Sequence, residues 1–147
     1  MVKHSSRDIF YRGAIPPSFI SESISKHASR TSIGGHSIFL GQIREDVFEG
    51  KKVIAIDYSA YEEMALVQLT SIREDIFAEF PLECLHVYHS LGTIKAGEIC
   101  FFVFASSAHR KAAIGACDKI VDRIKKELPI WGKEILEDDS FRWKSNR

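Results

Sequence analysis

The feature that most constrains the fold is a nearly continuous apolar stretch, EICFFVFA, from Glu98 to Ala105. A strand with one solvated face alternates apolar and polar residues, whereas a strand buried on both faces is apolar at successive positions. This stretch therefore predicts the central strand of a sheet. A long amphipathic pattern, from Ser106 to Glu134, follows it directly.

The segment from Ser106 to Glu134 is expected to be mainly helical. Its apolar residues recur close to the 3.6-residue period of an α-helix. They are Ala113, Cys117, Ile120, Ile124 and Leu128. Ser106 or Ser107 is the expected N-cap, because a hydroxyl there can accept a bond from a free backbone N–H group. After Pro129, residues 131–136 are expected to form a last strand.

The rest of the chain predicts an alternation of strands and helices. Further strands are expected at residues 8–13, 36–43, 52–60 and 82–90, and helices at 18–28 and 61–80. The strands at 36–43 and 52–60 are expected to pair as an antiparallel meander. Gly41 inside the first of them indicates a bulge or a close backbone approach. The economical fold is a single α+β domain over residues 1–147, with two long helices on one face of a largely antiparallel sheet.

Composition argues against several functional classes. The chain carries 20 basic and 20 acidic residues, so its formal net charge is zero and no global field favours nucleic acid or an anionic membrane. No apolar run approaches the roughly 20 residues that span a bilayer, and the first residues lack the apolar core of a signal peptide. Three widely spaced cysteines, with no CxxC pair, favour buried reduced thiols and a cytoplasmic location.

No familiar catalytic, nucleotide or metal motif is present. The sequence lacks GxSxG, HExxH, GxxxxGK[ST] and GxGxxG. His86 and His89 lie three apart in an expected strand and so point to opposite faces, which gives no metal-ligand spacing. No metal site is expected.

The remaining candidates for chemistry are cations at the two ends of the long helix. His109 and Arg110 lie at its start, where free N–H groups and the positive end of the dipole favour a bound anion. Lys125 lies near its end. The alternative is that these residues are solvated surface cations. Sixteen positions place His109 and Lys125 about 24 Å apart along the axis and about 160° apart around it. We therefore expect a composite site, in which His109 and Arg110 of one copy face Lys125 of a second copy in a homodimer.

Three segments together resemble the large, catalytic subunit of molybdopterin synthase. They are FLGQIR at residues 39–44, SSAHR at residues 106–110 and IKKELPIWGKE at residues 124–134. Tyr61 and Met64 match a further tyrosine-x-x-methionine element. The resemblance extends from about Phe10 to the C-terminus, and it implies a hammerhead-like α+β fold with a small β appendage.

The resemblance also implies a function. Proteins of this family convert cyclic pyranopterin monophosphate to molybdopterin, with sulfur from the C-terminal glycine thiocarboxylate of a small ubiquitin-like partner subunit. It implies no bound metal or redox cofactor. By resemblance Lys125 and Lys133 are catalytic. The residues implied to bind substrate are Phe39, Gln42, Arg44, His109, Arg110, Glu134 and Arg147.

One position departs from the family pattern. Members of the family often have lysine directly after the tryptophan, where this chain has Gly132 after Trp131. Lys133 either takes over through a bulge at Gly132 or aligns with the family's next basic residue while the first is lost. A family member with impaired activity therefore stays open as one alternative. Independently of Gly132, the other alternative is a non-catalytic α+β module that binds phosphate ligands or RNA.

Overall fold

The computed structural model describes residues 9–144. The elements in chain order are β1 (Phe10–Arg12), α1 (Pro17–Lys26), β2 (Gly35–Gln42), β3 (Val47–Phe48), β4 (Lys51–Ala60), α2 (Glu62–Glu79), β5 (Cys84–Lys95), β6 (Ile99–Ser107), α3 (Arg110–Glu127), β7 (Ile130–Leu136) and β8 (Phe141–Trp143).

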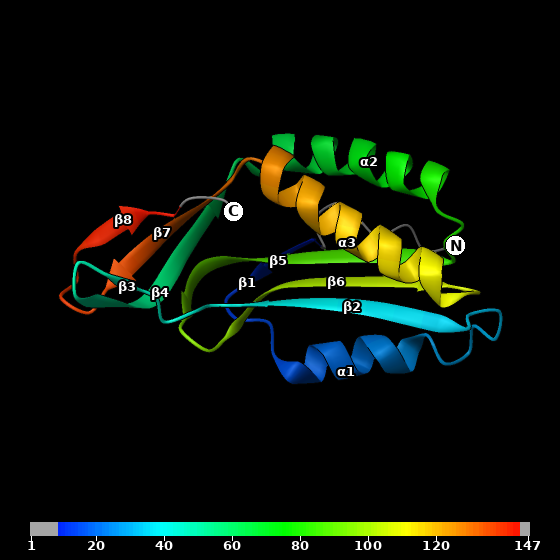
Figure 1. Ribbon diagram of the computed structural model, residues 1–147, viewed down its shortest axis with the longest axis horizontal. Coiled ribbons are helices and arrows are strands. Elements are labelled where there is room, and N and C mark those ends of the chain that lie inside the picture. Colours follow the sequence, from blue (N-terminus) through cyan, green and yellow to red (C-terminus); the bar gives the residue numbers. More distant parts are fainter. Residues whose placement is uncertain (1–8, 145–147) are drawn as a thin grey trace.

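One eight-stranded sheet organises the described chain. Its strands run in the order β2-β6-β5-β4-β7-β8, with β1 beside β5 and β3 beside β4. All the pairings are antiparallel except that of β1 with β5. The long helices α2 and α3 cover one face and the short helix α1 covers the other (Figure 1). The predicted α+β class, the largely antiparallel sheet and the shared face of the two long helices are confirmed.

Strand β6 is buried on both faces, as its apolar sequence predicts. Phe102 and Phe104 are fully buried and pack with Ile20 of α1. The alternate residues Val103 and Ala105 are also fully buried and belong to the core beneath α2 and α3. Successive side chains of a strand point to opposite faces, so a strand between two helical layers needs apolar residues at every position.

Strand β5 continues beyond the expected end at residue 90. It pairs with β6 through His89 and then with β4 from Gly92 to Lys95. Gly92 adopts a φ of 92°, which a glycine accepts at low cost. The residues after it form strand rather than the predicted connection, because Ile94 is fully buried opposite Ile56.

The predicted meander of residues 36–43 with residues 52–60 is wrong. Strand β2 pairs with β6, and β4 lies between β5 and β7. Strands β3, β4, β7 and β8 form an arm that extends beyond the ends of α2 and α3 (Figure 1). This arm is the small β appendage that the resemblance implied, and a main cavity lies at its base.

The segment from Ser106 to Glu134 is not one helix: it contains the end of β6, helix α3 and the first part of β7. Ser106 and Ser107 end β6, and the N-cap of α3 is His109, so the predicted serine N-cap is wrong. The Ser107 hydroxyl nevertheless accepts a bond from the Ala113 backbone N–H at 3.0 Å, inside the first turns. The helix ends before Pro129, and β7 follows as predicted.

Candidate active site

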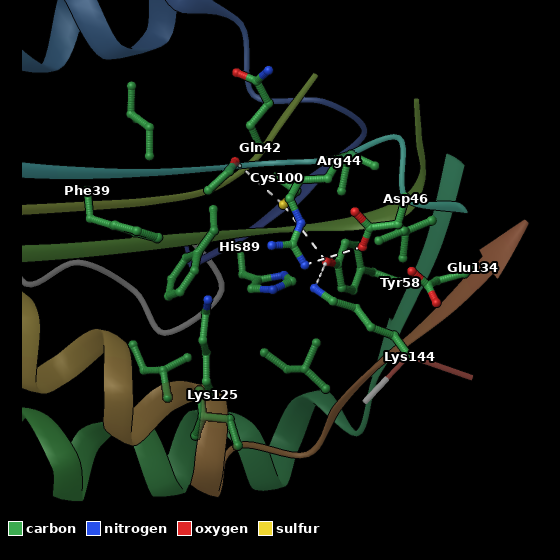
Figure 2. A pocket seen from close by; sticks show the side chains of 18 of the residues that line it. Phe39, Gln42, Arg44, Asp46, Tyr58, His89, Cys100, Lys125, Glu134 and Lys144 are labelled. Atoms are coloured by element: carbon green, nitrogen blue, oxygen red, sulfur yellow. Dashed lines mark hydrogen bonds and ion pairs between the residues drawn. The ribbon is translucent and has the colours of Figure 1, made fainter. Parts of the chain in front are cut away.

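A main cavity of about 730 Å³ opens where the arm meets the helical half of the molecule. The end of β2, the end of α3 and strands β4, β5, β6 and β7 each place side chains in its wall (Figure 2). Residues far apart in sequence therefore share one enclosure. Those used below are Phe39, Arg44, Tyr58, His89, Cys100, Lys125, Glu134, Arg142 and Lys144.

The bulge in β2 shapes the upper wall of the cavity. The pairing of β2 with β6 shifts register between Gly41 and Gln42, as the glycine predicted. A Cβ atom on Gly41 would lie 2.9 Å from the Cβ of Phe101, so the two strands approach too closely for a larger residue. Phe39 packs edge-on against Phe101, with ring centroids 5.6 Å apart, and its ring faces the cavity.

Lys125 enters the cavity from the last turn of α3. Its amine lies 5.6 Å from the centroid of the Phe39 ring, a cation–π distance. Figure 2 shows the side chain extending from the helix toward Phe39 and His89. The neighbouring Lys126 is exposed and pairs with Asp122 at 3.5 Å on the helix surface. The helix therefore presents one lysine, and not the next, to the cavity.

A second amine enters from the opposite wall. Lys144 follows β8, and its Nζ atom donates to the Tyr58 hydroxyl at 3.4 Å. The Sγ atom of Cys100 lies 3.9 Å from the same hydroxyl. The ring of His89 packs edge-on against Tyr58, with centroids 4.8 Å apart. Tyr58 thus contacts the amine of Lys144, the thiol of Cys100 and the imidazole of His89.

Burial around Tyr58 keeps the Tyr58 phenol, the His89 imidazole and the Cys100 thiol neutral. The pKa of His89 is lowered to about 4. Desolvation is the main cause, a bond to the Ser90 carbonyl opposes it, and the nearby Lys144 and Lys125 contribute to the lowering. Desolvation also raises the pKa values of Tyr58 and Cys100. The uncharged imidazole, phenol and thiol leave the lysines as the cations of this wall.

The Lys144 amine has a lowered pKa although much of the residue is exposed. Desolvation is the main cause; Cys100 and Glu134 raise the pKa, while Lys125 and Arg44 lower it. An amine with a lowered pKa exchanges its proton more readily near neutral pH. The cavity therefore combines fixed positive charge with a group that can serve as acid or base.

Acidic groups pair with the arginines at the cavity rim. Arg142 forms a salt bridge with the buried Glu134 at 2.8 Å, and its guanidinium stacks over the Phe48 ring at 4.0 Å. Arg44 pairs with Asp46 at 3.3 Å, and the Arg44 side chain is 74% exposed. Arg44 can therefore exchange its carboxylate for a ligand anion with little loss.

The structure brings together five of the residues that sequence reasoning selected. Phe39, Gln42, Arg44, Lys125 and Glu134 all line the main cavity. Gln42 lies at the rim, with its side chain directed away from Lys125 (Figure 2). Arg147 lies outside the described residues.

Lys133 lies outside the main cavity. Gly132, Glu134 and Leu136 are the buried positions of β7, so the intervening Lys133 points to the other face of the strand. Its amine lies 4.8 Å from the centroid of the Phe141 ring.

His109 and Arg110 lie in a different hollow. It has a volume of about 390 Å³ and is lined by these residues with Gly34, Ala108 and Lys111. The length of α3 separates it from the main cavity, as the spacing predicted. Within one chain the two cationic groups do not meet.

Sequence reasoning missed Lys144, Tyr58, His89 and Cys100. Tyr58, His89 and Cys100 read as ordinary core positions. Lys144 belongs to a basic C-terminal stretch, but its direction depends on β8, which was not predicted. Had β8 been expected, alternation would have placed Lys144 on the same face as Arg142.

Comparison with known proteins identifies the family. The family model described as MoaE protein matches residues 17–127. The chain belongs to the MoaE family. The molybdopterin synthase catalytic subunit of Pyrococcus abyssi is 36% identical over 126 residues, which cover 86% of this chain and 84% of that protein.

Other MoaE-family relatives differ in length. The molybdopterin synthase catalytic subunit of Drosophila willistoni is 40% identical over 116 residues, covering 78% of this chain but 31% of that protein. The chain thus spans about a third of the length of such relatives. No helix within residues 9–144 is long and apolar enough to cross a membrane.

Solved structures confirm the MoaE fold. Molybdopterin synthase from Staphylococcus aureus superposes with a TM-score of 0.82 at 29% identity, covering 97% of this chain and 99% of that chain. A complex of subunits 1 and 2 of molybdopterin-converting factor from Helicobacter pylori contains a chain with the same fold, with a TM-score of 0.79 at 17% identity.

Proposed function

We propose that this chain is the catalytic subunit of a molybdopterin synthase and transfers sulfur to cyclic pyranopterin monophosphate. The observation that carries the proposal is the main cavity, in which Lys125 and Lys144 approach from opposite walls beside Arg44. The MoaE family and the relatives of that name support it. The free cysteines are consistent with a reducing cytoplasm.

The charges of the main cavity suit both reactants. The substrate carries a phosphate, and a thiocarboxylate is also an anion. Arg44 is available for the phosphate because its present carboxylate partner is exposed. Phe39 offers an aromatic face against which a pterin ring can pack. Lysine amines can then stabilise negative charge that develops during the transfer.

The sulfur donor is proposed to be a small ubiquitin-like subunit whose C-terminal glycine carries the thiocarboxylate. The two-subunit assembly from Helicobacter pylori supports a partner of this kind. The donor's extended C-terminus would enter the main cavity, where its anionic thiocarboxylate would interact with the amines of Lys125 and Lys144. The folded part of the partner would remain outside.

The proposed transfer conserves the oxidation state of sulfur. The thiocarboxylate sulfur attacks a carbon of the pterin side chain, and the new C–S bond replaces a C–O bond of that carbon, whose oxygen leaves. The sulfur then carries the partner's acyl group as a thioester. Water hydrolyses this thioester, which leaves sulfur on the pterin and a carboxylate on the partner. A second partner supplies the second sulfur of the dithiolene in the same way. Of the two C–O bonds that break, one is an ester bond of the cyclic phosphate, which thereby opens, and the other releases its oxygen as water.

Lys125 is proposed as the principal catalytic residue and Lys144 as the second amine. Lys144 suits proton transfer because desolvation of its amine lowers its pKa, with a further lowering from the nearby Lys125. Lys133 lies on the opposite face of β7 and suits this role poorly. Lys144 also weakens the reading of an impaired family member, because the main cavity keeps a second amine despite Gly132.

His109 and Arg110 are proposed to complete the site from a second copy of the chain. They lie too far along α3 to reach the main cavity of their own chain. A two-fold dimer contacts itself through the same surface on both copies, so one such interface would create two equal composite sites.

The direct test is to incubate the protein with cyclic pyranopterin monophosphate and a thiocarboxylated partner. Mass spectrometry should detect the dithiolene product and the partner's carboxylate form. Absence of product, when the partner binds and a known synthase is active in the same assay, would refute the proposal. Strongly salt-dependent oligonucleotide binding would instead favour the binding module.

A further inference from the structure

Two histidines and a cysteine gather on the sheet face opposite the main cavity. They are His27, the C-cap of α1, and Cys84 and His86 at the start of β5. Their ligand atoms all lie within 4.8 Å of one another. The Nε2 atoms of His27 and His86 are 3.1 Å apart.

The fold, rather than the sequence spacing, creates this cluster. Cys84 and His86 are two positions apart on a strand, so both side chains point to one face. That face is the one covered by α1 (Figure 1), and the end of α1 brings His27 across to them. His27 and His86 are 59 positions apart in sequence. The expectation of no metal site considered His86 and His89, which point to opposite faces.

The hydrogen bond at the other nitrogen of His27 fixes its protonation. The Nδ1 atom lies 2.7 Å from the backbone carbonyl of Ser23, and a carbonyl oxygen can only accept. The proton of a neutral His27 ring is therefore on Nδ1, and Nε2 presents its lone pair toward His86. Histidines that bind metals are commonly held in this way, with the second ring nitrogen donating to a carbonyl or carboxylate.

The distances also suit a small tetrahedral ion. Zinc binds imidazole nitrogen at about 2.0–2.1 Å, so two nitrogens of a tetrahedral site lie about 3.3 Å apart. The observed 3.1 Å between the two Nε2 atoms is close to this value. A thiolate with two imidazoles is a donor set typical of zinc, with water or another ligand at the fourth position.

The surroundings hold the ligands in place. Cys84 is 7% exposed, and the His27 ring stacks on Phe104 with centroids 4.7 Å apart. His36 lies beside the cluster, but its Nδ1 atom is 2.7 Å from the Ser106 hydroxyl. A bound ion would join the end of α1 to the first strand residues of β5.

We propose that His27, Cys84 and His86 form a zinc-binding site that fastens α1 to β5, separate from the main cavity. The site does not depend on the proposed sulfur transfer, because its residues lie on the other face of the sheet.

Metal binding by untagged full-length protein tests this directly. After treatment with a chelator, the protein should bind one zinc ion per chain in competition with a chromogenic chelator. Cobalt(II) at the site should show the visible bands of tetrahedral coordination and a near-ultraviolet thiolate-to-cobalt charge-transfer band. Failure of the wild-type protein to bind either ion would overturn the proposal and leave an ordinary hydrogen bond between His27 and His86.

Substitutions then assign the ligands. Cys84→Ser should abolish the charge-transfer band, and His27→Gln and His86→Gln should each weaken zinc binding at least about tenfold. Cys117→Ser and His109→Gln are the matched controls and should bind like wild type. Circular dichroism checks that each variant folds. Binding that persists unchanged in all three ligand variants would show zinc held elsewhere and overturn the assignment.

Discussion

Gly132 and Lys144 face each other across the ladder between β7 and β8, where the Lys144 backbone N–H donates to the Gly132 carbonyl at 2.8 Å. The adjacent pair is Lys133 with Trp143, so the alternation of the two strands puts position 132 and Lys144 on one face. Gly132 has no side chain, and its missing Cβ would lie 3.0 Å from both Ile56 and Tyr58. Lys144 brings an amine to that same Tyr58.

Replacing Lys144 should therefore impair sulfur transfer more than replacing Lys133. We expect Lys144→Ala to lower kcat by about a hundredfold, the scale of a lost acid–base group. Lys133→Ala removes an amine on the opposite face of β7 and should stay near wild type. Equal losses in the two variants would remove the distinction between these lysines.

The Lys144→Arg variant separates charge from proton transfer. Arginine keeps the positive charge but does not release a proton at ordinary pH. If Lys144 transfers a proton, Lys144→Arg should remain slow and lose one limb of the pH–rate profile. Recovery of wild-type kcat and pH profile in Lys144→Arg would limit Lys144 to an electrostatic role.

Replacing Lys125 should have the largest effect on turnover. Its amine faces the main cavity near Phe39, where it can stabilise charge in the transition state. We expect Lys125→Ala to lower kcat about a hundredfold or more, with the melting temperature unchanged. Lys126→Ala is the matched control because its amine pairs with Asp122 on the helix surface. A Lys125→Ala enzyme with wild-type kcat would exclude the proposed role.

Hybrid dimers test the composite site. Arg110→Ala and Lys125→Ala subunits should each be inactive as homodimers. In the proposed mixed dimer, intact Lys125 of one copy would face intact Arg110 of the other at one of the two sites, so equal random mixing should restore about a quarter of wild-type activity. Native mass spectrometry can verify that heterodimers form. If they form and remain inactive, each site is complete within one chain.

Mild acid should destabilise the protein through His89. The pKa of its buried ring is lowered from 6.5 to about 4. The unfolded chain therefore takes up a proton there below about pH 6.5, whereas the folded chain does not until about pH 4. The stability that the neutral His89 ring contributes is fully present above pH 6.5 and is lost as the pH falls toward 4. The free energy of unfolding then decreases by up to about 3 kcal/mol.

Denaturant unfolding at several pH values measures this effect. Between pH 6.5 and 4.5 the free energy of unfolding should fall more steeply for wild type than for His89→Gln, which cannot titrate. Parallel pH profiles for the two proteins would assign the acid sensitivity to other groups.

Helix α3 offers a matched test of core packing. Ile120 is fully buried beneath the helix, whereas Ile114 is 54% exposed on its outer face. Ile120→Ala should lower the free energy of unfolding by about 2–5 kcal/mol, because a cavity remains. Ile114→Ala should change it by less than about 1 kcal/mol. Similar losses at both positions would indicate that the outer face of α3 is also covered in solution.

The sequence by itself determined the buried central strand and the two long helices, whereas Phe39, Gln42, Arg44, Lys125 and Glu134 were selected from the family resemblance. The apolar run of β6 required cover on both faces, and the 3.6-residue stripe of α3 predicted which of its residues are buried. Such patterns are local, because a strand or helix displays its own period regardless of its neighbours. The two cationic ends of α3 could likewise be separated by helix geometry alone.

Only the tertiary structure decided which side chains meet. Lys144 rather than Lys133 faces Tyr58 because the register of β8 against β7 sets which face each residue occupies. His27 reaches His86 because α1 packs across the sheet. Pairing partners and register depend on contacts between distant segments, and a shift of one residue would turn every side chain of a strand to its other face.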